Sequence, residues 1–425
     1  MALPFTSKLS GLWQHDNFLR LWAAQSLSAI GGRITRTALP MIAIITLASP
    51  EATIGLLSAA GLIPVALMGL FGGGFVERAR KRDLMVSLDL MRAGLILLIP
   101  IAAWVGMLQL WLLFVIAAIA GAATALFQNA DVAFLPRLVG REHLVEGNSK
   151  LQATESAAEF IGPGLAGLLI QFLTAPFAIV FNVATFLWSA FWLARIKNVV
   201  EERVGVPSDS RRLTVLMEDL KVGWRAIMSQ PALRAAFLSS SIQQISWGFF
   251  FALYQLFVLR ELHLSPAIVG IIISGGGVSG LIGAFVAGPL IKRAGFGAAV
   301  LIAFALAQVG NSLLLLAAVG GPLTIPLLFG HQLFGDGCLV AFMIMVTSLR
   351  QTTVAENEIA RANGVFQAVS GVVLPMASIG AGFLAGRFGT QMGVMIGVAI
   401  GWLGLLPLIS PRLLKLRTVE QAQPA

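Results

Sequence analysis

Two glutamates, Glu155 and Glu159, lie four residues apart in a segment that is otherwise apolar enough to cross a lipid bilayer. This spacing places both carboxylates on one face of a helix. A carboxylate in hydrocarbon costs about 2.5–3.5 kcal/mol even on the lenient insertion scale, so it is usually kept for a function. Desolvation and mutual repulsion favour the protonated form of one member of such a pair, which suits a reversible proton carrier. The alternative is a neutralised pair held by arginine.

Two arginines of an earlier apolar segment are candidates for that arginine partner. Arg33 and Arg36 lie in the middle of the segment, where charged side chains are costly. We expect Arg33 or Arg36 to pair with Glu155 or Glu159 in one conformational state, and protonation of the glutamate to release the pair. Alternatively, the arginines bind an anionic substrate, because guanidinium groups form strong charge-assisted hydrogen bonds with anions.

A helix break is predicted just after the glutamates, at Gly162, Pro163 and Gly167. Proline removes one backbone donor and clashes with the preceding turn, and packing within a membrane protein can satisfy the freed groups. Acids beside a break in an apolar segment are typical of the coupling segment of a membrane transporter.

Further polar side chains lie in later apolar segments. Asp336 is either a substrate or proton site or the partner in an interhelical hydrogen bond, and Asp131 is a weaker candidate. Amides and aromatic rings that face a cavity suit amphipathic substrates of varied shape. The candidates for such a cavity are Gln243, Gln244, Trp247, Tyr254 and His331.

The composition excludes a soluble enzyme. Of the 425 residues, 57% are hydrophobic and 12% are charged, whereas soluble domains carry about 25% charged residues. The net charge of +9 is attributed to positive-inside topology and not to nucleic acid binding. The single cysteine, Cys338, excludes an intramolecular disulfide, and the four scattered histidines show no metal-site spacing. No phosphate-binding loop of an ATPase is present, so we expect no cofactor, no metal and no enzymatic activity.

Twelve apolar stretches are each long enough to cross a bilayer as a helix. We expect spans at residues 18–47, 52–76, 84–106, 109–135, 145–173, 176–196, 232–259, 266–291, 296–319, 323–349, 358–386 and 390–411. If both termini lie in the cytoplasm, the basic residues between the spans also lie there, except for Arg260 and Arg387, which face outside. The predicted fold is an all-α, multi-pass membrane protein.

The longest polar stretch separates two bundles of six helices. We expect an N-terminal bundle at 1–196, a cytoplasmic linker at 197–231 and a C-terminal bundle at 232–425. Within the linker, apolar residues recur at helical spacing on one face: Leu213, Leu216, Leu220, Trp224 and Ile227. This pattern predicts an amphipathic helix that lies either on the membrane surface or against the bundle.

An internal repeat relates the two halves. A shift of 215 residues aligns residues 54–79 with residues 269–294 without a gap. Because this shift contains six spans, the two copies share one orientation. The sequence therefore predicts two parallel six-helix pseudo-repeats, with a substrate site between them near the bilayer midplane.

The repeat also separates shared features from features of one half. Glycine recurs at Gly73 and Gly288 and arginine at Arg78 and Arg293, so we interpret the glycines as sites of close helix approach and the arginines as loop contacts. The candidate functional residues lack such partners, which makes them specialised. Their counterparts are Lys292 for Glu77, Ser370 for Glu155, Leu374 for Glu159, Ser378 for Pro163, Gly121 for Asp336, Gly248 for Arg33 and Phe251 for Arg36.

With these motifs the chain resembles the major facilitator superfamily, and within it the drug:proton antiporter branch that includes macrolide-efflux and enterobactin-exporter proteins. The resemblance covers nearly the whole chain. Residues 73–82 are similar to motif A of the superfamily, G-x-x-x-D-R-x-G-R-R, with Glu77 in place of Asp. Gly162, Pro163 and Gly167 are similar to the antiporter motif of the fifth span, with Ala158 and Ala166 replacing two of its glycines.

The resemblance implies a cytoplasmic gate and a proton pathway. Motif A charge pairs hold the outward-open state together, so Gly73, Glu77 and Arg78 would form part of the cytoplasmic gate. Two acids frequent in relatives are replaced here by Gly32 and Asn182, which leaves Glu155 and Glu159 with fewer rivals as proton carriers.

We therefore expect a monomeric secondary active transporter in a bacterial plasma (inner) membrane. It would export small amphipathic molecules in exchange for protons by alternating access. Its partners would be a small-molecule substrate, protons and the lipid bilayer, with no nucleic acid. The alternatives are a siderophore or metabolite exporter or importer of the same fold, and a membrane sensor that transports nothing.

Overall fold

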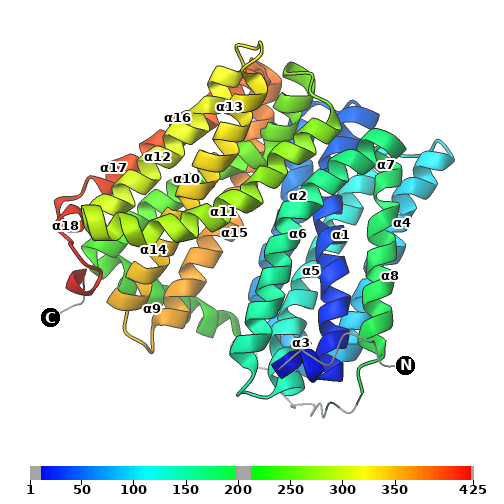
Figure 1. The fold of residues 1–425 in the computed structure, drawn as a ribbon, viewed down its shortest axis with the longest axis horizontal. Helices are drawn as coiled ribbons and strands as arrows, with labels where there is room; N and C mark the ends of the chain where they lie inside the picture. Colours follow the sequence, from blue (N-terminus) through cyan, green and yellow to red (C-terminus); the bar gives the residue numbers. More distant parts are fainter. Residues whose placement is uncertain (1–10, 198, 200–211, 423–425) are drawn as a thin grey trace. The chain divides into compact units, whose positions relative to one another are not determined.

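The structure is a computed structural model that describes residues 11–197, 199 and 212–422. The predicted linker at 197–231 therefore falls partly outside the described residues. The regular elements of the described part are all helices (Figure 1). In chain order they are η2 (Gly11–Gln14), α1 (Asp16–Met41), η3 (Ile42–Thr46), α2 (Glu51–Phe71), α3 (Gly73–Arg78), α4 (Lys81–Trp104), α5 (Leu110–Val139), α6 (Leu144–Leu173), α7 (Ala175–Ala178), α8 (Val180–Ala194), α9 (Arg212–Ser229), α10 (Pro231–Leu256), η4 (Phe257–Glu261), α11 (Pro266–Ala294), α12 (Phe296–Ala317), α13 (Thr324–Gly330), η5 (His331–Asp336), α14 (Gly337–Thr353), α15 (Ile359–Phe388), α16 (Thr390–Leu403), α17 (Leu405–Leu408), α18 (Pro411–Leu414) and η6 (Glu420–Ala422).

Within the described residues, eleven helical segments are long and apolar enough to cross a membrane, which confirms the prediction of an all-α, multi-pass membrane protein. The first predicted span is present as α1 and η3, but it is not among the eleven. Arg33 and Arg36 lower the mean hydropathy of this helix. The expected total of twelve spans, like the cytoplasmic location of the termini, stays a prediction.

The chain divides into two compact units, which we call unit 1 and unit 2. Unit 1 contains Met1–Ser49, Ala60–Pro207 and Pro266–Ile271, and unit 2 contains Pro50–Ala59, Ser208–Ser265 and Ile272–Ala425. Two helices are divided between the units. The start of α2 belongs to unit 2 and its remainder to unit 1, whereas the start of α11 belongs to unit 1 and its remainder to unit 2. The boundary near residue 207 lies within the predicted linker.

The core of unit 1 is formed where α1, α4, α5 and α8 pack together. Its fully buried side chains include Phe18 on α1, Met85 on α4, Phe134 on α5 and Leu193 on α8. α1 contacts α6 on one side and α8 on another, and α4 contacts both α5 and α8. This packing fixes α1 and α6 beside each other, which matters for the charged residues that they carry.

The core of unit 2 is built around α10, which packs against α15 and α16. Phe304 on α12 and Phe342 on α14 are fully buried and lie edge to face, with ring centroids 4.8 Å apart. Phe237 on α10 contacts Phe366 on α15 in the same geometry. Aromatic pairs of this kind are each worth about 0.5–1.5 kcal/mol beyond the burial of their area.

The repeat is visible in two close helix crossings. In unit 1, a methyl group at Gly270 of α11 would lie 2.9 Å from the Cα of Gly167 on α6. In unit 2, a methyl group at Gly55 of α2 would lie 3.0 Å from the Cα of Gly382 on α15. The shift of 215 residues relates Gly55 to Gly270 and Gly167 to Gly382. Small residues therefore allow the same close backbone approach in both units.

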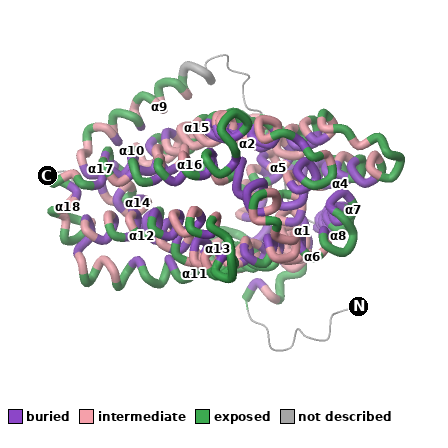
Figure 2. Tube along the Cα trace, turned by 90° about the horizontal axis from the view of Figure 1, so that it is seen from above, coloured by how far each residue is buried: buried purple, intermediate pink, exposed green. Residues whose placement is uncertain are grey.

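The linker helix α9 packs against the bundle of unit 2. Gly223 lies against the backbone of Arg361 on α15, Ile227 is fully buried, and the Trp224 ring contacts Phe237 edge to face at 5.7 Å. Asp219 forms an ion pair with Arg361 at 2.7 Å. Exposed and half-buried residues nevertheless cover most of this helix (Figure 2). The sequence predicted a helix on the membrane surface or against the bundle, and the structure shows contact with the bundle. The side chain of Leu213 lies outside the described residues.

Candidate functional site

The predicted charged residues of unit 1 meet between α1 and α6. The Arg33 guanidinium lies 2.9 Å from a carboxylate oxygen of Glu155 and 2.5 Å from one of Glu159. Arg36 lies 2.6 Å from the other carboxylate oxygen of Glu159. We call these four residues the α1–α6 charge cluster. Glu159 thus contacts two arginines, whereas Glu155 contacts one.

The charge cluster is accessible and not sealed in the core. The exposed fractions of the side chains are 22% for Arg33, 49% for Arg36, 48% for Glu155 and 41% for Glu159. Charged groups are too costly to leave facing hydrocarbon, so these side chains require water beside them. Ion pairs in contact with water can exchange protons and partners, which a reversible carrier needs.

Glycine and hydrogen bonding bring the two helices close at this point. A methyl group at Gly162 of α6 would lie 2.3 Å from the Cβ of Arg33, so a larger residue would displace α1. Earlier in both helices, the indole nitrogen of Trp22 on α1 donates to the hydroxyl of Thr154 on α6 at 2.9 Å. Gly162 therefore positions Arg33 against the two glutamates.

The prediction of a helix break at Gly162, Pro163 and Gly167 is wrong, because α6 continues without interruption from Leu144 to Leu173. Proline leaves the carbonyl of the residue four positions earlier, here Glu159, without its helical donor. The helix is held on both sides by packing: Gly162 contacts Arg33, and Gly270 of α11 approaches the carbonyl of Pro163 and Gly167. Tertiary contacts thus keep the proline within a continuous helix.

A second polar group lies where α1 packs against α8. The side-chain amide of Asn182 donates to the hydroxyl of Thr35 at 2.5 Å, and the hydroxyl of Thr185 donates to the oxygen of Asn182 at 2.8 Å. A methyl group at Gly31 would overlap both α8 side chains. Asn182 therefore forms a hydrogen bond between α8 and α1. Elsewhere in unit 1, Asp131 accepts a hydrogen bond from Gln25.

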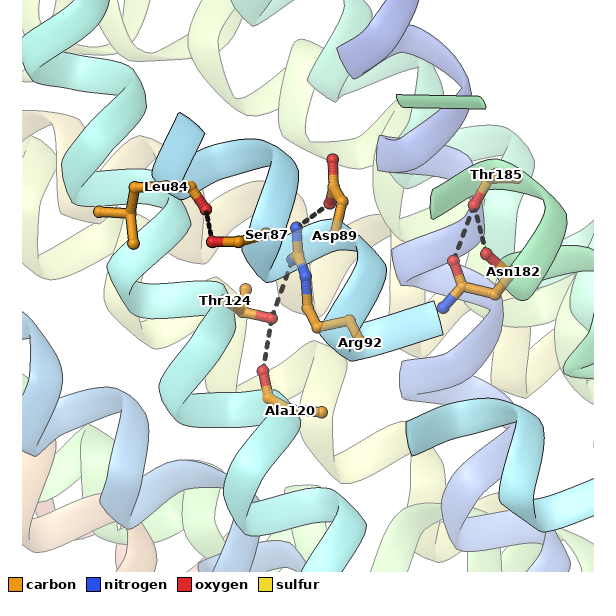
Figure 3. Close-up of polar contacts among 8 residues, drawn as sticks. All are labelled: Leu84, Ser87, Asp89, Arg92, Ala120, Thr124, Asn182 and Thr185. Carbon is orange, nitrogen blue, oxygen red and sulfur yellow. Dashed lines mark hydrogen bonds and ion pairs between the residues drawn. The ribbon is translucent and has the colours of Figure 1, made fainter. Parts of the chain in front are cut away.

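A buried ion pair on α4, between Asp89 and Arg92, was not predicted from the sequence (Figure 3). Their side chains are 0% and 5% exposed. The guanidinium also lies over the rings of Phe127 and Phe186, at 4.6 and 4.4 Å from their centroids, and donates to Thr124 at 3.3 Å. This pair joins α4 to α5 and α8. Its signal was present in the sequence as opposite charges three residues apart within an apolar span.

The loop motif after α2 forms the short helix α3. Glu77 and Arg78 are exposed, and within the described residues neither forms an ion pair. The interpretation of Gly73 and Gly288 as sites of close helix approach is wrong, since a methyl group at either would meet no atom within 4 Å. Gly72 has that role instead, because a methyl group there would lie 2.8 Å from Leu126 and 3.3 Å from the amide of Asn129 on α5.

In unit 2, His331 and Asp336 begin and end the π-helical turn η5. The counterpart of this turn in the repeat, residues 116–121, lies within the regular helix α5. The His331 ring is buried against those of Tyr254 and Phe250, with centroids 5.7 and 5.8 Å away. The carboxylate of Asp336 lies against Gly276 of α11. Such turns are frequent at functional sites, so Asp336 and His331 remain candidates.

The predicted cavity residues of the seventh span separate in the structure. Gln243 is buried and accepts a hydrogen bond from Gln308 of α12 at 2.9 Å, and Trp247 is 37% exposed. Gln244 instead lines a cavity of about 380 Å³ inside unit 2, between α10, α14 and α15. The same cavity contains Arg350, which is not among the site residues predicted from the sequence.

Comparison with known proteins gives one family match along nearly the whole chain. The family model described as transmembrane secretion effector matches residues 6–424. The uncharacterized MFS-type transporter YvqJ of Bacillus subtilis is 21% identical over 355 residues, which is 80% of both proteins. Macrolide efflux protein A of Streptococcus pyogenes is 29% identical over 155 residues, covering 36% of this chain and 37% of that protein.

Solved transporter structures share the fold. A bacterial homologue of the iron transporter ferroportin, solved in an inward-facing state, has a TM-score of 0.72 at 19% identity, covering 94% of this chain and 99% of that one. The nucleoside transporter NupG has a TM-score of 0.73 at 14% identity, covering 92% of this chain and 98% of that one.

Proposed function

The chain belongs to the transmembrane secretion effector family of major facilitator transporters, and from that premise we propose that it is a proton-coupled exporter of small amphipathic molecules. The observation that carries this proposal is the α1–α6 charge cluster. It places two carboxylates and two guanidinium groups in one accessible group on helices that pack together. Membership of the family makes the chain an integral, multi-pass membrane transporter and not an enzyme.

Each side chain of the cluster has a role in the proposed cycle. When Glu159 is ionised, Arg33 and Arg36 bind it, and Arg33 also binds Glu155. A proton on Glu159 removes the charge that both arginines contact, so the attraction between α1 and α6 weakens. Breaking or forming these pairs biases the equilibrium between two conformations only if their contacts differ between the two. Alternating access would supply that difference.

Export from the cytoplasm is the direction that the relatives favour. Macrolide efflux protein A is named for the efflux of macrolides, and part of its sequence matches this chain. Export across a bacterial inner membrane that is driven by protons flowing inward would then be antiport. A siderophore or metabolite carrier of the same fold would use the same cluster with another substrate.

Inverted membrane vesicles test the proposal, because export into the medium becomes uptake into the vesicle lumen. With the lumen acidified, wild-type vesicles should accumulate at least one member of a panel of fluorescent dyes, and an ionophore that collapses the pH gradient should stop accumulation. Glu159→Gln should lower the rate at least about tenfold. The matched control is Glu142→Gln, whose side chain is 81% exposed and which should transport normally.

Two results would contradict the proposal. Accumulation that continues after the pH gradient has collapsed would exclude proton coupling. A complete lack of flux for every dye, at normal protein levels, would favour the membrane sensor that transports nothing.

A further inference from the structure

The cavity of unit 2 lies between α10, α14 and α15 and has a volume of about 380 Å³. This volume lies within the range of small-molecule sites, roughly 300–1,000 Å³. Its lining has an apolar part, formed by residues such as Phe237, Met343 and Phe366. The polar part is formed by Ser240, Gln244, Arg350 and Asn363. We call this site the Arg350 cavity.

Arg350 differs from three other arginines at helix contacts, Arg33, Arg92 and Arg361. Arg33, Arg92 and Arg361 each bind a carboxylate, whereas Arg350 has no carboxylate within 4 Å in the part of the chain that the structure describes. Its guanidinium lies over the Phe366 ring, 4.4 Å from the centroid. Its Nε is buried and has no hydrogen-bond partner among the described residues. A half-buried guanidinium without a counter-charge favours an anion beside it.

Three further polar atoms of the same cavity are buried without a partner among the described residues. They are the Ser240 hydroxyl and the side-chain oxygens of Gln244 and Asn363. The amide nitrogen of Gln244 already donates to Ser370 at 2.6 Å, which directs the oxygen of that amide elsewhere. A buried polar group without a hydrogen-bond partner is unfavourable. A ligand that is anionic and also carries a hydroxyl or amide donor would satisfy the cavity.

The repeat shows that this arrangement is specific to unit 2. The counterpart of Arg350 in unit 1 is Leu135, which is buried in the core, and the counterpart of Ser370 is Glu155. At equivalent positions, unit 1 therefore places a carboxylate and unit 2 a hydroxyl. An acid at residue 370 would neutralise Arg350 and repel an anion, and its absence leaves the Arg350 cavity positive.

We propose that the Arg350 cavity binds the negatively charged group of an amphipathic organic anion, and that such anions are the substrate class of this transporter. The apolar lining would contact the hydrocarbon part, while Arg350 binds the charge. Ser240, Gln244 and Asn363 would recognise neighbouring polar groups. The assignment of this ligand as a substrate depends on the proposed transport function, but its binding does not.

Binding can be measured without transport, on the full chain in nanodiscs of zwitterionic lipid and without any pH gradient. The probes are fluorescein, an anionic xanthene dye, and rhodamine 123, a cationic xanthene dye of similar size, followed by fluorescence anisotropy. Fluorescein should bind saturably, and Arg350→Gln should weaken its affinity at least about tenfold, or about 1.4 kcal/mol. Arg350→Lys should keep most of the affinity, and rhodamine 123 should not lose affinity in either variant.

Arg361→Gln is the matched control, because Arg361 lies eleven residues further along and is paired with Asp219 outside the cavity. It should bind fluorescein like the wild type. The proposal is overturned if the wild type does not bind fluorescein saturably, or if Arg350→Gln leaves fluorescein affinity unchanged. Equal weakening of both dyes by Arg350→Gln would also overturn it, since that result indicates damage to the fold.

A lipid headgroup offers the same chemistry as a dissolved anion, so the titration is repeated in nanodiscs that contain phosphatidylglycerol. Unchanged fluorescein affinity supports a dissolved substrate as the occupant. If phosphatidylglycerol weakens fluorescein binding to the wild type but has no effect on Arg350→Gln, an anionic lipid occupies the same cavity. That result would overturn the assignment of a dissolved anion as the substrate. Because neither measurement involves flux, failure of proton-coupled transport would leave the binding result intact.

Discussion

Two of the arginine–carboxylate groups in unit 1 differ in accessibility. The α1–α6 charge cluster joins two arginines to two glutamates, and the glutamate side chains are 41–48% exposed. The pair of Asp89 and Arg92 on α4 is sealed, with exposed fractions of 0% and 5%. Two aromatic rings cover the sealed guanidinium, whereas in the cluster Glu159 is shared between two arginines.

This difference in accessibility separates a fixed ion pair from an exchangeable one. Removing one partner of a buried pair leaves an uncompensated charge in a medium of low dielectric constant, which is strongly unfavourable. An exposed pair contributes about 0–1 kcal/mol to stability, so it can open at little cost. We therefore propose that the Asp89–Arg92 pair holds α4, α5 and α8 together and that the α1–α6 cluster exchanges protons.

The largest effect is expected from breaking the sealed pair. Arg92→Gln should destabilise the folded protein by about 3–5 kcal/mol, because Asp89 would remain buried without its counter-charge. Thermal unfolding followed by tryptophan fluorescence measures the loss. The double replacement Asp89→Leu with Arg92→Met should recover most of it; a double variant no more stable than Arg92→Gln would show that the charges themselves are required.

A smaller effect is expected from disturbing the position of the accessible cluster. Gly162→Ala should cost about 1–3 kcal/mol of stability, because the added methyl group overlaps Arg33 and forces α1 and α6 apart. Dye transport should fall as well. Gly32→Ala is the control, since a methyl group there meets no atom within 4 Å. Equal transport by both variants would mean that the spacing of Arg33 from the glutamates does not matter.

Within the cluster, the two arginines should contribute unequally. Arg33 contacts both glutamates, whereas Arg36 contacts Glu159 alone. Arg33→Gln should therefore lower proton-driven dye transport about tenfold, equivalent to about 1.4 kcal/mol, and Arg36→Gln by a smaller factor. Initial rates in inverted vesicles, normalised to protein level, give the comparison. The reverse order would move the centre of the coupling reaction to Arg36.

The smallest effect on stability is expected from the accessible glutamates. Glu155→Gln should change the unfolding free energy by less than about 1 kcal/mol, because the Glu155 side chain is 48% exposed and an exposed ion pair contributes little to stability. Thermal unfolding of Glu155→Gln and of Arg92→Gln, measured under the same conditions, compares the two losses of stability. A loss as large as that of Arg92→Gln would remove the distinction between the two groups.

Much of this arrangement could be predicted from the sequence. Apolar spans and the repeat predicted the all-α fold. Asymmetry between the repeats selected Glu155, Glu159, Arg33 and Arg36, and the structure places these side chains together. The spacing on each helix determines which residues share a face. The contact between the two helices was predicted only from the opposite charges of their arginines and glutamates.

The same criterion would have found the sealed pair. The counterparts of Asp89 and Arg92 in unit 2 are Phe304 and Ala307, so both charges belong to one half. They were missed because opposite charges three residues apart on one helix look like a local surface pair. Burial by Phe127 and Phe186 comes from two other helices and cannot be read from this spacing.

Other misses have the same tertiary origin. Whether Gly72 or Gly73 faces α5 depends on the rotation of one helix, which the glycine run does not specify. Pro163 was predicted to break α6, but packing of Gly162 and Gly167 keeps the helix continuous. Arg350 was not predicted as a site residue, because the cavity around it forms only when α10, which is distant in sequence, packs beside α14 and α15.

We propose that the accessible cluster, and not the sealed pair, exchanges a proton. Infrared difference spectroscopy between acidic and alkaline pH measures this directly, because a protonated carboxyl group has its own carbonyl band. The wild type should show such a band. It should persist in the double replacement Asp89→Leu with Arg92→Met and decrease strongly in Glu155→Gln with Glu159→Gln. A band that survives loss of both glutamates, or that disappears with Asp89, would contradict the account.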